Sequence, residues 1–286
     1  QLGAFTPFFR IHSMAGSPDQ EPWAFGEEVE RISRRYIELR YQLLPYLYTA
    51  AWQASRSGLP IMRALAFAYP EDEATHSLDD QFLFGDGLLV APVLEPGATR
   101  RKVYLPAGAW FDFWTGEMHL GPQTVEVPAP LEVLPLFVKG GAAIPFWPVQ
   151  QYVGERVIDT FVGAIVALVV IDELELRLYW AAGDHTSFLY EDDGEHPDPE
   201  APGASRLSRF RLRGTSEGRG RFIRRTVFGT YPLSYERVRL VIIGLKARPK
   251  RVRLHGGSLL DELWDEETRR LTLRCRVGSE FAVELG

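Results

Sequence analysis

Residues 27–67 read EEVERISRRYIELRYQLLPYLYTAAWQASRSGLPIMRALAF. From Glu27 to Ser57 the apolar residues recur at steps of three and four, which is the spacing of an amphipathic helix with one buried face. Pro45 lacks the N–H that a helix interior needs, so we expect it to kink the helix or divide it near Leu44. The Ser-Gly-Leu-Pro sequence that follows predicts the end of the helix.

Extended segments are expected on both sides of this helix in the chain. Ile61 to Phe67 is an apolar run that predicts a buried strand, and we interpret Arg63 within it as a structural residue that braces loops through a carboxylate. The order strand, helix, strand is typical of the end of a (β/α)8 barrel. Barrel enzymes carry their chemistry at the carboxyl ends of the strands, so side chains shortly before the helix would line a pocket.

The segment before the helix, GAFTPFFRIH at residues 3–12, combines three aromatic rings with Arg10 and His12. In an extended chain, residues two apart point to the same side, so the guanidinium and the imidazole would share one face. Both groups donate hydrogen bonds and can orient a carboxylate, which suits a ligand rich in hydroxyl groups. The alternative is the end of a surface strand, with an ion-pairing arginine and a histidine that lines the core.

The sequence pattern after residue 77 predicts mainly β-strands. Short apolar or aromatic runs bounded by turns predict strands at 82–84, 88–93, 103–105, 110–114 and 133–138. Later runs alternate apolar residues with arginines, at 209–213, 237–240, 251–254 and 270–277. The expected fold class is α/β plus all-β: the end of a (β/α)8 barrel (residues 1–77) followed by two β-sandwich domains (residues 78–148 and 149–286).

Several motifs, in this order, resemble those of the C-terminal part of family 31 glycoside hydrolases, the α-glucosidase and α-xylosidase family. They are GAFTPFFRIH, LRYQLLPYLYTAAWQASRSGLPIMRAL, QFLFGDGLLVAPV, VYLPAGAWFDFWTGE, PLFVKGGAAIP and FLYEDDGE. The resemblance implies that Arg10 and His12 line the pocket for the sugar being cleaved, with the histidine bonded to sugar hydroxyls and the arginine bracing nearby acidic residues. The chain departs from the family pattern at Ala64, where proline is common, and at residues 157–171.

The resemblance also implies an aspartate nucleophile and an aspartate acid/base, and both motifs lie upstream of the segment with which this sequence begins. Retaining hydrolysis needs two carboxyl groups about 5 Å apart. Asp19 and Glu21 are better explained by entry into the helix, and the pairs at 79–80 and 192–193 lie in turn-like contexts. We therefore expect no catalytic residue in this chain and no turnover by it alone.

The composition of the chain argues against several classes of partner. The net charge of −6 gives no overall attraction to nucleic acid or to an anionic membrane, and the arginines of the alternating strands are expected to pair with acidic neighbours. The apolar run at 161–171 is too short to span a bilayer and predicts buried strand. The single cysteine, Cys275, cannot form an internal disulfide and is expected in the core. The two-carboxylate chemistry implies no metal and no organic cofactor.

The leading hypothesis is part of a retaining glycoside hydrolase for α-glucosides or α-xylosides. Its expected partners are an α-linked oligosaccharide or glycoside and the rest of the barrel upstream. The alternative is a non-catalytic carbohydrate-binding or scaffolding protein built on β-sandwiches. A transglycosylase is a third possibility, because water and a sugar hydroxyl compete for the same intermediate. A cytoplasmic location is favoured, while the preferred sugar and the oligomeric state stay open.

Overall fold

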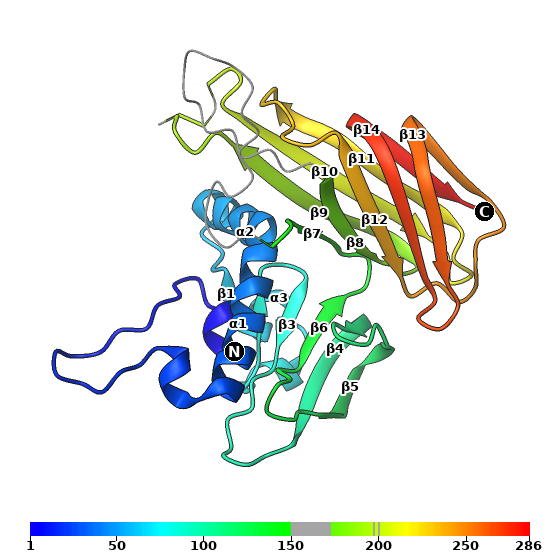
Figure 1. Cartoon of the computed structure of the whole chain (residues 1–286). Helices are drawn as coiled ribbons and strands as arrows, with labels where there is room; N and C mark the ends of the chain where they lie inside the picture. The colour runs from blue at the N-terminus through cyan, green and yellow to red at the C-terminus, as the bar shows by residue number, and fades with distance from the viewer. Residues whose placement is uncertain (150–172, 197, 200) are drawn as a thin grey trace.

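Two consecutive helices stand beside two β-sheets (Figure 1). The computed structural model describes residues 1–149, 173–196, 198–199 and 201–286. Helix α1 (Glu27–Gln42) is followed directly by α2 (Leu44–Ser57), and Pro45 lies in the first turn of the second helix, where its missing N–H costs nothing. The predicted division near Leu44 is confirmed. Gly58, in a left-handed conformation, ends α2 as its C-cap.

The first sheet has six strands in the order β1-β2-β3-β6-β4-β5, and every pair in it is antiparallel. Its strands are β1 (Met62–Arg63), β2 (Phe82–Phe84), β3 (Leu88–Val90), β4 (Arg100–Asp112), β5 (Met118–Pro128) and β6 (Leu136–Lys139). Short helical segments precede and interrupt it: η1 (Leu2–Phe5), η2 (Pro22–Phe25), α3 (Leu65–Ala68) and η3 (Glu73–Thr75).

The second sheet has eight strands, seven of them in the order β7-β8-β12-β14-β11-β10-β9, with β13 also paired to β14. Strands β8 and β12 run parallel, and the other pairs are antiparallel. Its strands are β7 (Ala143–Phe146), β8 (Glu173–Tyr179), β9 (Gly183–Asp192), β10 (Ser205–Gly214), β11 (Gly220–Gly229), β12 (Arg237–Ile243), β13 (Val252–Asp265) and β14 (Arg270–Leu285). The alternating runs seen in the sequence lie in β10, β12, β13 and β14, as predicted.

Three expectations about strands differ from the structure. The strand expected at 61–67 is limited to β1, because the chain turns into α3 at Leu65, which is fully buried. The runs at 103–105 and 110–114 are not separate: both belong to β4, which absorbs the intervening Pro-Ala-Gly in a register shift. Strand β5 was not expected, because most of its residues are exposed and carry no apolar alternation.

The two sheets do not follow the expected domain boundaries. Strand β1 precedes residue 78 but pairs with β2, and β7 precedes residue 149 but pairs with β8, so the chain crosses between the sheets inside the expected domain boundaries. The apolar run at 161–171 lies outside the described residues.

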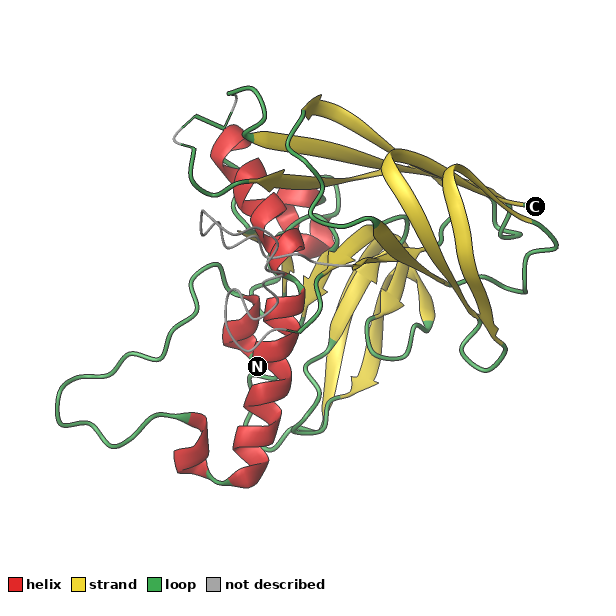
Figure 2. Ribbon diagram, turned by 45° about the horizontal axis from the view of Figure 1, so that its top comes forward, coloured by secondary structure: helices red, strands yellow, loops and turns green. Residues whose placement is uncertain are grey.

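Three apolar clusters hold these layers together. One lies within the second sheet, and another includes Leu83, Val103 and Trp110 of the first sheet. The third joins α1 and α2 to both sheets. Trp110 and Phe111 are fully buried, so the aromatic run that contains them packs in the core. Figure 2 shows the two helices along one side of the sheets.

Two expectations about side chains of the second sheet are confirmed. Cys275 is buried and free. Arginines on the second sheet pair with carboxylates, for example Arg211 with Asp184 and Arg274 with Glu173. Among the described residues, no helix is long and apolar enough to cross a membrane.

Candidate functional site

The N-terminal segment is anchored on α1. Phe5 is fully buried and meets the rings of Tyr36 and Phe84 edge-on, with centroids 6.3 and 5.9 Å away. The Arg40 guanidinium donates 2.7 Å hydrogen bonds to the carbonyls of Ala4 and Thr6, and a 3.1 Å bond to that of Pro7. This one side chain therefore fixes the path of the backbone that leads to the predicted site.

Beyond this anchor, the chain between η1 and η2 extends away from the helices and sheets, in both views (Figures 1 and 2). Arg10 and His12 lie on this exposed loop. The expectation that they sit at the end of a strand is wrong, because residues 6–21 form neither helix nor strand here and pair with no neighbouring strand. The two side chains nevertheless meet: Arg10 Nη2 lies 2.6 Å from His12 Nδ1, and the guanidinium stands over the Phe8 ring at 5.8 Å.

This contact determines which histidine nitrogen is available to a ligand. A guanidinium has only N–H donors, so Nδ1 of His12 must accept and the ring proton lies on Nε2. His12 then presents an N–H donor from Nε2, while Arg10 keeps its remaining N–H groups. The pair can therefore donate to hydroxyl or carboxylate oxygens from both side chains at once.

Exposed apolar side chains flank this pair in the sequence. The large exposed residues of the segment are Phe8, Phe9, Ile11, Met14, Trp23 and Phe25. So many large apolar side chains exposed within one segment are typical of a binding or packing surface. Neither Arg10 nor His12 lines any of five cavities of about 370 to 860 Å³ in the described part of the structure.

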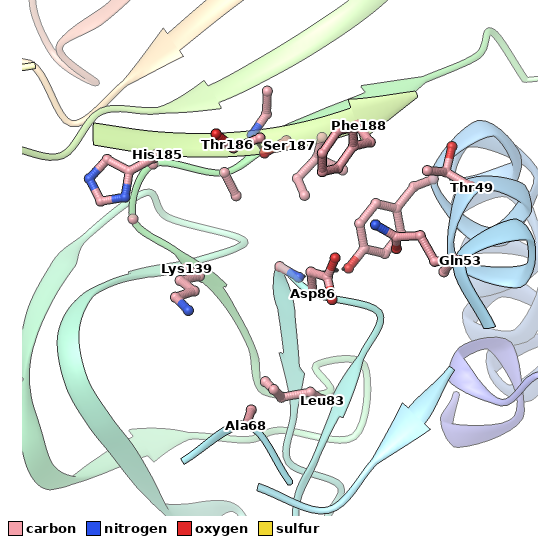
Figure 3. Close-up of a pocket in the computed structure, with 18 of the residues that line it drawn as sticks. Thr49, Gln53, Ala68, Leu83, Asp86, Lys139, His185, Thr186, Ser187 and Phe188 are labelled. Carbon is pink, nitrogen blue, oxygen red and sulfur yellow. Dashed lines mark hydrogen bonds between the residues drawn. The ribbon is translucent and has the colours of Figure 1, made fainter. Parts of the chain in front are cut away.

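A separate polar cavity of about 370 Å³ lies where α2, the β2–β3 turn and β9 converge (Figure 3). Asp86 and Gln53 line one side of it, and Lys139 and His185 the other. Arg63 is buried beneath it and contacts Asp86 at 2.5 Å, which supports the structural role predicted for this arginine.

Four of the carboxylates considered as substitutes for catalytic aspartates have structural positions. Glu21 is the residue before η2, and Asp80 pairs with Arg101 at 2.7 Å. Asp192 accepts from the Tyr48 hydroxyl, and Asp193 accepts from two backbone amides, which lowers its pKa. Within the described part of the chain, no cluster of three or more His, Cys, Asp or Glu side chains could hold a metal ion.

Two family models match most of the first half of the chain. Residues 1–50 match the glycosyl hydrolases family 31 TIM-barrel domain, and residues 58–144 match the glycosyl hydrolase family 31 C-terminal domain. The chain belongs to glycosyl hydrolase family 31. The resemblance inferred from the motifs is confirmed, and the barrel end followed by β-rich structure agrees with the family 31 order of domains.

The named relatives include an alpha-glucosidase and an alpha-xylosidase. Alpha-glucosidase 2 of Bacillus thermoamyloliquefaciens is 45% identical over 196 residues, which are 68% of this chain and 23% of the relative. An alpha-xylosidase of Saccharolobus solfataricus is 35% identical over 68% of this chain and 24% of its own length. The chain thus spans about a quarter of the length of these relatives.

A solved family 31 structure has the same fold over nearly the whole chain. The Flavobacterium johnsoniae dextranase, determined with isomaltotriose, superposes with a TM-score of 0.77 and 32% identity, covering 93% of this chain and 34% of its own. An alpha-xylosidase of Xanthomonas citri matches with a TM-score of 0.67 and 34% identity over 85% of this chain and 25% of its own.

Arg10 and His12 were predicted from the sequence as site residues, but Arg40, which supports their segment, was not. Arg40 lies four residues after the buried Tyr36, on the side of α1 that faces the N-terminal segment. A cation at a step of four from a buried aromatic residue is the signal that could have indicated this contact. Its carbonyl partners lie 33 to 36 residues earlier, so the sequence could not identify them.

Proposed function

We propose that this chain is part of a retaining glycoside hydrolase that acts on α-glucosides or α-xylosides, and that Arg10 and His12 bind the sugar. The proposal rests on the contact between Arg10 and His12. Both residues lie on an exposed segment whose start is bonded to Arg40 of α1. The family match and the named glucosidase, xylosidase and dextranase relatives support the substrate class. In this proposal the nucleophile and the acid/base belong to a part of the barrel outside these residues.

The exposed apolar surface beside the pair fits the same proposal. Phe8, Ile11 and Trp23 would pack against the remainder of the barrel, which would enclose Arg10 and His12 in a pocket. We assign residues 1–77 to the barrel end, 78–148 to a proximal β-domain and 149–286 to a distal β-domain. The first segment supplies sugar contacts, and the two β-domains support it through the cluster that joins the helices to both sheets.

A chimera tests the sugar-binding role. The matching segment of Alpha-glucosidase 2 is replaced by this chain, and kcat/KM is measured on an aryl α-glucoside. His12→Ala should lower kcat/KM by about a hundredfold, because a donor to a sugar hydroxyl is lost from a positioned site. His255→Ala, at an exposed histidine of β13, is the matched control and should change nothing. Equal activity of the two variants would exclude His12 from the sugar site.

The chain alone provides the complementary measurement. Without two carboxyl groups placed across the scissile bond, it should not hydrolyse an aryl α-glucoside. Turnover by the purified chain that disappears in the His12→Ala variant would show that catalytic carboxylates lie within these residues.

A further inference from the structure

A second cavity, of about 490 Å³, lies between α2 and the end of β9. This is within the size range of small-molecule sites in proteins. Its walls come from α2, from the residue that follows β7, and from the Phe188–Glu195 motif, to which neither the barrel nor the Arg10–His12 pair assigns a role. The lining residues used below are Tyr48, Ala51, Trp147, Glu191, Asp192 and Tyr231.

The walls of this cavity are fixed by contacts that do not depend on a ligand. Both carboxylate oxygens of Asp192 lie 2.7–2.8 Å from the Tyr48 hydroxyl, across 144 residues of chain. Tyr190 stacks on Trp52 with ring centroids 5.0 Å apart, and its amide donates to Thr49 on α2. A ligand would therefore meet a prearranged surface and would lose little affinity to side-chain ordering.

The lining combines aromatic and aliphatic side chains with carboxylates. Trp147, Tyr48 and Tyr231 supply rings, each with a polar edge, and Leu44 and Leu47 add aliphatic surface. Carboxylates accept hydrogen bonds only, so Asp192, whose carboxylate faces Tyr48 on α2, suits a ligand that offers O–H donors. A pyranose ring has that composition, because its C–H faces are apolar and its hydroxyls point outward around the edge.

The partners of the lining carboxylates favour a neutral sugar over a cation as the ligand. Glu191 lies 3.2 Å from the buried guanidinium of Arg224, and Asp192 is bonded to Tyr48. These carboxylates therefore already have protein donors and do not require a bound cation. Asp192 accepts from the Tyr48 hydroxyl and the Gly194 amide, and a carboxylate has acceptor sites beyond these two for a sugar hydroxyl.

We propose that the cavity between α2 and the end of β9 is a binding site for a pyranose unit of an oligosaccharide. The lining residues named above all belong to this chain, so binding there can be measured on the chain itself. The proposal goes beyond the proposed function, and the Arg10–His12 pair takes no part in it.

Titration calorimetry with maltotriose on the chain as it stands tests the proposal. We expect saturable binding with a dissociation constant of about 1 mM. Ala51→Trp places an indole in the cavity from the helix side and should weaken binding at least about tenfold. Ser55→Trp is the matched control: it adds the same side chain one turn later on α2, at an exposed residue outside the cavity, and should bind like the parent.

Three results would overturn the site. They are no saturable binding of maltotriose, equal binding by the Ala51→Trp variant, and binding of tetramethylammonium with no binding of maltotriose. The circular dichroism spectrum of each variant shows that it is folded. Failure of this experiment leaves the His12→Ala chimera result unaffected, because the two tests change different residues.

Discussion

The hydroxyl of Tyr46 offers a direct test of how α2 is joined to the first sheet. It donates a 2.6 Å hydrogen bond to the carbonyl of Phe84 and accepts a 2.9 Å bond from the amide of Gly87. The ring is 8% exposed, and both backbone partners are buried. A Cβ on Gly85, which has a φ of +65°, would lie 2.5 Å from this hydroxyl, so the turn needs glycine for the tyrosine to reach it.

Tyr46→Phe keeps the ring and removes both hydrogen bonds. Each buried backbone group left without a partner costs about 1–3 kcal/mol, and the phenylalanine avoids burying a hydroxyl, so we take the lower half of that range for each group. The expected loss in the free energy of unfolding is about 3 kcal/mol. Tyr48→Phe, two residues along the same helix, removes a hydroxyl from a side chain that is 45% exposed and should cost less than about 1 kcal/mol.

Urea unfolding followed by tryptophan fluorescence measures both variants against the parent. The m-values should stay equal, because neither substitution changes the surface exposed on unfolding. If Tyr46→Phe and Tyr48→Phe differ by less than about 0.5 kcal/mol, the buried double hydrogen bond does not hold α2 on the sheet, and the reasoning is refuted.

Three further predictions concern side chains that join distant segments. Asp86→Asn should lower the free energy of unfolding by about 1–2 kcal/mol in the same urea assay, since it leaves the buried Arg63 charge without its carboxylate, and no loss would contradict the role of this pair. Arg40→Met should speed hydrogen exchange at the amides of residues 4–6 about tenfold, measured by mass spectrometry, because three bonds to that segment are lost; unchanged exchange would contradict the anchor. Arg211 holds the pKa of Asp184 well below the ordinary 3.8, so ionised Asp184 contributes stability above that pH that is lost on acidification. The melting temperature of Asp184→Asn should therefore fall less between pH 5 and pH 3 than that of the parent, and parallel curves would contradict this.

The helices could be predicted from the sequence because their determinants are local. A step of three or four in apolar residues, a proline and a left-handed glycine act within a few residues of themselves, and they place α1, α2 and the break between them. Local sequence could not show that the strand expected at 61–67 is limited to residues 62–63. Arg63 is buried because Asp86, on a later turn, reaches it, and no periodicity within the run shows that partner.

In the candidate site, too, the local features could be predicted and the tertiary contacts could not. Arg10 and His12 were expected on one face because alternate residues of an extended chain share a side, and the two side chains meet although the segment joins no sheet. Their support depends on α1 packing beside the N-terminal segment, where Arg40 reaches three carbonyls. Local sequence could name the pair, but only the tertiary structure shows what holds it.

Arg224 shows how the same limit affects the inferred sugar cavity. In the sequence it belongs to a basic run that includes Arg219 and Arg225 and suggests a solvated face. In β11 the side chains alternate, so Arg224 shares the inward face of Phe222 and is fully buried. A buried guanidinium is costly unless it is paired, and its partner Glu191 comes from β9, on the wall of the cavity. The charge pair therefore fixes the end of β9, where the next residue, Asp192, faces α2 across the cavity.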